Sequence, residues 1–85
     1  MAETDDPRQR LMAHILDTYP KARHSEFTAD DGLLEKEIID SLRLLELVGF
    51  IEREFQIFIT GYDLTPENFT SVNTIVTFLE RKLEG

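Results

Sequence analysis

Three stretches of this sequence place apolar residues every three or four positions, which is the spacing of an amphipathic helix. The first follows Asp6-Pro7, a helix cap and a proline suited to the first helical position, and ends at Pro20. The second covers about residues 42–55, and the third follows Ser71, another cap. The expected buried stripes are Leu11, Met12, Ile15, Leu16 and Tyr19 in the first, Leu44, Val48, Ile51 and Phe55 in the second, and Val72, Ile75, Val76, Leu79 and Leu83 in the third.

A long connection and a short helix complete the expected fold. Residues 21–40 show no sustained period, but their apolar anchors predict an ordered loop: Phe27, Leu33, Leu34, Ile38 and Ile39. Thr65-Pro66-Glu67 has a cap-and-proline signature, which predicts a short helix through Phe69. The sequence therefore predicts an all-α four-helix bundle with three longer helices, a short helix 3, and a long loop between helices 1 and 2.

The length of the chain, 85 residues, corresponds to one small domain over residues 1–85. One core of this size leaves no room for an enclosed catalytic cleft, which argues against an enzyme. The chain contains no cysteine, so disulfides, thiolate metal sites and cysteine nucleophiles are excluded. No segment is apolar enough to span a bilayer, and residues 1–20 lack the apolar core of a signal peptide. We therefore expect a soluble, cytoplasmic monomer without membrane insertion.

The negative charge lies in the middle of the chain. Residues 25–70 contain 11 acidic and three basic residues, which accounts for the whole net charge of −8. Phosphate backbones require the opposite sign, so nucleic acid is not an expected partner. A basic protein surface, attracted by the long-range field, is the expected one. The alternative is an ordinary solvated acidic surface that binds no partner, which would carry the same charge.

The segment Ile38-Ile39-Asp40-Ser41-Leu42 ends the long connection and opens the second amphipathic helix. Asp40 is placed to cap that helix, which leaves the hydroxyl of Ser41 free for chemistry. A phosphate on this hydroxyl would lie against free backbone N–H groups at the positive end of the helix dipole. The alternative is that Ser41 is a simple helix cap.

From about residue 11 to residue 83, the chain resembles the acyl carrier protein family. The resemblance rests on Asp40-Ser41-Leu42 at a helix start, the apolar, glutamate-bearing stretch through Val48, and Ile51-Glu52-Arg53-Glu54-Phe55 at the end of the helix. Downstream, the family's apolar and cap positions are matched by Ile59, Phe69 and Ser71-Val72.

The resemblance implies that Ser41, preceded by Asp40, receives a 4′-phosphopantetheine arm from coenzyme A. The thiol of the arm then holds an acyl group as a thioester, so the chain is a free-standing carrier and not an enzyme. The implied partners are a phosphopantetheinyl transferase, an acyl- or aminoacyl-loading ligase, and acyltransferases or synthases with basic docking surfaces. The expected partner-recognition residues are Leu42, Glu46, Gly49, Phe50 and Glu52.

Two departures from the family pattern bear on partner choice. Gly49 stands where the family usually has a larger apolar residue, and Arg53 stands where it usually has an acid. Both departures question whether the carrier serves ordinary fatty-acid synthesis enzymes. Asp40 counts against the peptidyl carriers, which commonly have glycine before the serine.

Two other functions remain open. One is a stand-alone aminoacyl carrier charged by a dedicated ligase, and the other is an unmodified acidic module that binds a basic protein through the face from Leu42 to Phe50. No metal site is expected, because His14 and His24 have no matching ligand cluster and are interpreted as surface histidines.

Overall fold

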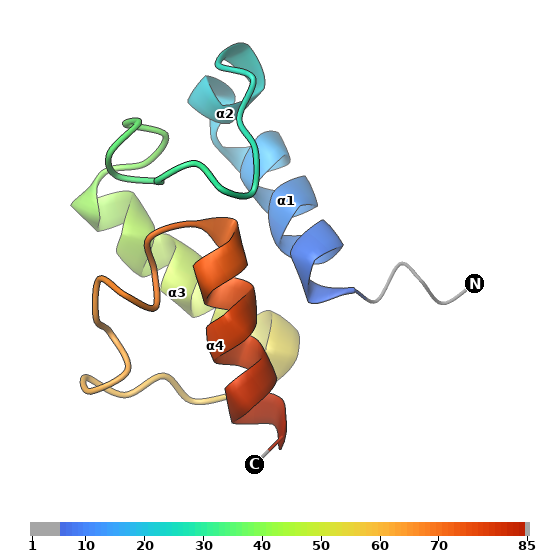
Figure 1. Ribbon diagram of the computed structural model, residues 1–85, viewed down its shortest axis with the longest axis vertical. Helices are drawn as coiled ribbons and strands as arrows, with labels where there is room; N and C mark the ends of the chain where they lie inside the picture. The colour runs from blue at the N-terminus through green and yellow to red at the C-terminus, as the bar shows by residue number, and fades with distance from the viewer. Residues whose placement is uncertain (1–5, 85) are drawn as a thin grey trace.

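The structure, a computed structural model, describes residues 6–84 and consists of four helices joined by two long connections (Figure 1). The helices are α1 (Pro7–Thr18), α2 (Pro20–His24), α3 (Ser41–Phe55) and α4 (Val72–Glu84). Residues 6–84 form no strand, so the prediction of an all-α, four-helix fold is confirmed. None of the helices in this part of the chain combines the length and the apolar character needed to cross a membrane.

Local capping sets where the longer helices begin. The Asp6 side chain accepts a hydrogen bond from the Arg8 N–H at 3.1 Å at the start of α1. At the start of α4, the Ser71 hydroxyl accepts from the Thr74 N–H at 3.3 Å, and the Thr74 hydroxyl accepts from the Ser71 N–H at 2.9 Å. Both caps satisfy N–H groups that a helix start would otherwise leave unpaired, as the sequence predicts.

The short helix lies at a different place from the one expected. Residues 65–69 form a turn, held by hydrogen bonds from the Asn68 N–H to the Thr65 carbonyl at 3.1 Å and from the Phe69 N–H to the Pro66 carbonyl at 3.2 Å. The short helix is instead α2, which begins at Pro20 directly after the extended residue Tyr19. Proline ends α1 because it cannot continue a helix, and it opens α2 because the first helical position needs no N–H donor.

The core lies between the three longer helices and the connection of residues 25–40. Helix α1 packs against α4 and α2. The largest fully buried side chains are Leu11, Ile15, Leu33, Leu47, Ile51, Val72, Ile75 and Leu79. The predicted stripes are correct except at their margins. Leu47, which was not in the predicted stripe, is fully buried because the buried face of α3 is wider than one stripe. Leu83, which was predicted to be buried, is 53% exposed because the last turn of α4 extends past α1 (Figure 1).

The connection of residues 25–40 is ordered, as predicted. The Leu33 N–H donates to the Thr70 carbonyl at 2.8 Å, and the Asn73 N–H donates to the Ala29 carbonyl at 3.0 Å. Four of the five predicted anchors are buried: Phe27, Leu33, Ile38 and Ile39. The prediction for Leu34 is wrong, since it is 46% exposed and lines a surface groove next to α3.

Candidate functional site

Ser41 is the first residue of α3, and its hydroxyl is free. The Asp40 carboxylate caps the helix by accepting from the Arg43 N–H at 2.8 Å, and the Asp40 carbonyl accepts from the Leu44 N–H at 2.9 Å. Ser41 is exposed, and within residues 6–84 its hydroxyl has no hydrogen-bond partner. Ile38 and Ile39 are buried just before it, which anchors the backbone that leads into the site. The structure therefore presents a positioned but unused nucleophilic oxygen.

A groove of about 530 Å³ lies beside Ser41, between residues 32–35, the first turns of α3 and residues 64–70. We call it the Ser41 groove. Most of its lining is apolar: Leu34, Leu44, Leu45, Leu64, Pro66 and Phe69. Such a lining favours the burial of an apolar chain, at roughly 25 cal/mol for each Å² removed from water. The groove was not predicted, because its walls come from three segments that no single helical pattern relates.

Three of the expected recognition residues lie on the outer surface of α3. Leu42 is 66% exposed, and Glu46 is exposed one turn further along the helix. Gly49 is half-buried, and a Cβ atom placed there would contact only the Arg53 Nη1 atom, at 3.5 Å. A Cβ atom therefore fits at Gly49 with only ordinary van der Waals contact.

The other two expected recognition residues are engaged within the fold. The half-buried Phe50 ring stacks on the His14 ring of α1, with the ring centroids 3.7 Å apart and the planes 6° from parallel. The Glu52 carboxylate accepts from the Ile59 N–H at 2.8 Å and so ties the end of α3 to the following loop. A helical wheel gives the direction of a side chain but not its neighbours, so these contacts could not be read from the sequence.

His14 is less exposed than the sequence suggests, because it forms part of the contact between α1 and α3. Burial lowers the pKa of the His14 imidazole; nearby Asp17 and Glu54 oppose this, and Arg53 adds to it. The neutral ring is therefore the form that the folded protein favours.

This lowered pKa predicts how stability changes with pH. In the unfolded chain, histidine titrates at about pH 6.5. Because the folded pKa is lower, the stabilisation is complete above that value and is lost as the pH falls towards the folded pKa. The melting temperature should therefore decrease between about pH 7 and pH 5.

The matched control uses the two histidines of the chain. His14→Gln should flatten this pH dependence, whereas His24→Gln, at an exposed position, should retain it. Asp31 and Asp63 have lowered pKa values because backbone N–H groups donate to them, so they titrate below this window. An unchanged slope in His14→Gln would contradict the assignment.

Comparison with known proteins gives one informative relative. No protein-family model matches the chain. The chain is 26% identical over 72 residues to the probable acyl carrier protein PigG of a Serratia strain, and the match covers 85% of this chain and 83% of the relative. The chain is thus similar to a probable acyl carrier protein, and its all-helical fold agrees with that similarity.

Proposed function

We propose that the chain is an acyl carrier protein that holds its cargo as a thioester on a 4′-phosphopantetheine arm at Ser41. The observation that carries this proposal is the free, exposed hydroxyl of Ser41 at the capped start of α3, next to an apolar groove. The relative's name supports the same role. An exposed hydroxyl at a helix start, with an apolar groove beside it, suits a carrier that other enzymes load and unload.

The residues around Ser41 fit the attachment of such an arm. A phosphopantetheinyl transferase would take the proton of the Ser41 hydroxyl while its oxygen bonds to phosphorus and the nucleotide part of coenzyme A leaves. Asp40 keeps the helix start in place during this step by accepting from the Arg43 N–H. Leu34, Leu44 and Phe69 offer apolar contacts along the groove. The arm supplies a thiol, which this cysteine-free chain lacks.

The proposal can be tested on the protein as its own cells make it. Intact mass spectrometry should show one 4′-phosphopantetheine group together with a cargo that hydroxylamine releases. The mass lost on release distinguishes an acyl cargo from an aminoacyl cargo, which a dedicated ligase would load. A chain that carries no added mass under any growth condition would instead support an unmodified acidic interaction module.

We further propose that partner enzymes with basic surfaces dock on the face of α3 formed by Leu42, Glu46 and Gly49. Leu42 and Glu46 are exposed and Gly49 is half-buried, and the surrounding residues 25–70 carry the whole net negative charge. Opposite charges steer association and raise the on-rate more than they raise the affinity.

Charge reversal at Glu46 tests this docking face. Glu46→Lys should slow association with a basic partner by roughly tenfold at low salt, and the difference should shrink as salt screens the charges. The unfolding free energy should change by less than about 0.5 kcal/mol, because Glu46 is exposed. Stopped-flow mixing with the transferase at two salt concentrations measures the effect.

Glu52→Lys is the informative comparison for Glu46→Lys. It makes the same charge change but also removes the acceptor of the Ile59 N–H, so it should lower the melting temperature. An association rate that is insensitive to both salt and Glu46→Lys would overturn the electrostatic part of the docking proposal.

A further inference from the structure

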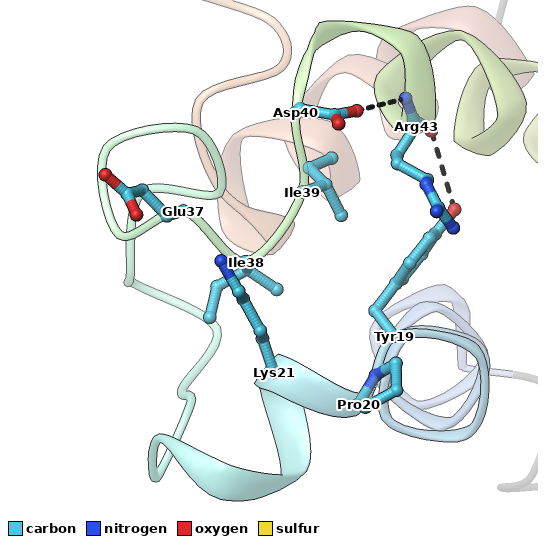
Figure 2. Close-up of a pocket in the computed structure, with 8 residues that line it drawn as sticks. All are labelled: Tyr19, Pro20, Lys21, Glu37, Ile38, Ile39, Asp40 and Arg43. Carbon is cyan, nitrogen blue, oxygen red and sulfur yellow. Dashed lines mark hydrogen bonds between the residues drawn. The ribbon is translucent and has the colours of Figure 1, made fainter.

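A second hollow, of about 390 Å³, lies between α2 and the first turn of α3 (Figure 2). We call it the α2–α3 hollow, and it shares no lining residue with the Ser41 groove. Pro20, Ile38 and Ile39 give it an apolar floor. Tyr19 stands at its edge and is almost fully buried, and its hydroxyl donates a long hydrogen bond of 3.5 Å to the Arg43 carbonyl.

Two cationic side chains line this hollow, Lys21 from α2 and Arg43 from α3. Within residues 6–84 neither forms an ion pair, whereas Lys36 pairs with Asp31 at 3.2 Å. Arg43 is one of only three basic residues in residues 25–70, a stretch that contains 11 acidic ones. Both side chains line one hollow beside the attachment point, with Lys21 on the side of Ile38 and Arg43 on the side of Tyr19 (Figure 2).

The two carboxylates that also line the hollow form no ion pair with these cations within residues 6–84. The Asp40 carboxylate is engaged by the Arg43 N–H at the helix start, at 2.8 Å. Figure 2 shows the Glu37 carboxylate pointing away from both Lys21 and Arg43. The two cationic side chains are thus available to a group that enters over the apolar floor.

We propose that the α2–α3 hollow binds one oxyanion carried by the arm on Ser41, either the phosphodiester next to the serine or a carboxylate on the cargo. This inference rests on the proposed function. A guanidinium can donate two parallel hydrogen bonds to a phosphate or a carboxylate, and a nearby ammonium adds a point charge. Tethering gives the anion a millimolar effective concentration, so a weak site on the surface would still be filled.

The binding site itself can be tested without any arm. Unmodified protein is titrated with inorganic phosphate at low salt, and backbone amide chemical shifts are followed by NMR. Saturable shifts are expected at Tyr19, Ile39 and Arg43. Lys21→Gln and Arg43→Gln should each weaken binding by up to about fivefold, the upper end for losing one solvent-exposed ion pair. Lys36→Gln is the matched control and should bind phosphate like the wild type, because Lys36 lies outside the hollow.

A second comparison identifies the source of the anion. If it is the phosphodiester, adding the arm with a free thiol should shift the same amides, and Arg43→Gln should reduce those shifts. If it is the cargo carboxylate, only protein loaded with a dicarboxylic acyl group should show them. The inference fails if phosphate produces no saturable shifts, if the glutamine variants bind like the wild type, or if neither form of the arm moves these amides. Those failures differ from failure of the proposed function, in which Ser41 accepts no arm.

Discussion

Ser41→Ala is expected to fold like the wild type and to accept no arm at all. Loss of the hydroxyl removes the oxygen that forms the phosphoester, so arm attachment should be abolished. Folding should survive because Asp40 provides the cap of α3. Alanine is a good helix former, and the change in unfolding free energy should stay within about 0.5 kcal/mol. Intact mass after incubation with coenzyme A and a phosphopantetheinyl transferase, together with thermal unfolding, measures both effects.

Ser71→Ala is the matched control for that experiment. Ser71 caps α4 through reciprocal hydrogen bonds with Thr74, so its removal should cost about 1 kcal/mol of stability. Ser71→Ala should nevertheless take up the arm fully, because the Ser41 site is intact. Arm attachment to Ser41→Ala would show that another residue is modified, and an unfolded Ser41→Ala protein would show that Ser41 is mainly structural.

Leu47→Ala is expected to have the largest effect on stability. Leu47 is fully buried on the inner face of α3, the helix that carries Ser41 at its start. Removing a buried leucine side chain costs the transfer free energy of the lost atoms and leaves a cavity, about 2–5 kcal/mol in total. For a domain of this size, such a loss should lower the melting temperature by more than about 10 °C. Urea unfolding followed by circular dichroism gives the free energy directly.

Leu45→Ala makes the same chemical change two residues away on the same helix. Leu45 is 58% exposed, so this variant should lose less than about 0.5 kcal/mol. Equal destabilisation by the two variants would mean that α3 is rotated relative to the core described above.

The starts of the longer helices could be predicted because the responsible residues are local. Asp6, Asp40 and Ser71 each hydrogen-bond to a backbone N–H two or three residues ahead, and the sequence alone displays that spacing. The place of the short helix could not be predicted in the same way. Thr65-Pro66 has a cap residue before its proline, whereas Tyr19 forms no side-chain cap hydrogen bond, yet the short helix begins at Pro20.

The candidate site was only partly predictable for a related reason. Ser41 and Asp40 act within one turn of α3, so their geometry follows from a short stretch of sequence. The roles of Phe50 and Glu52 depend on His14 and Ile59, which come from other parts of the chain. The Ser41 groove and the α2–α3 hollow likewise exist only once distant segments are packed together.

The most direct test of the carrier assignment is to incubate the wild-type protein with coenzyme A and a broad-specificity phosphopantetheinyl transferase. We predict that the intact mass rises by one 4′-phosphopantetheine group and that peptide mapping places this group on Ser41. A folded protein that gains no mass while a known carrier is fully modified under the same conditions would contradict the central claim.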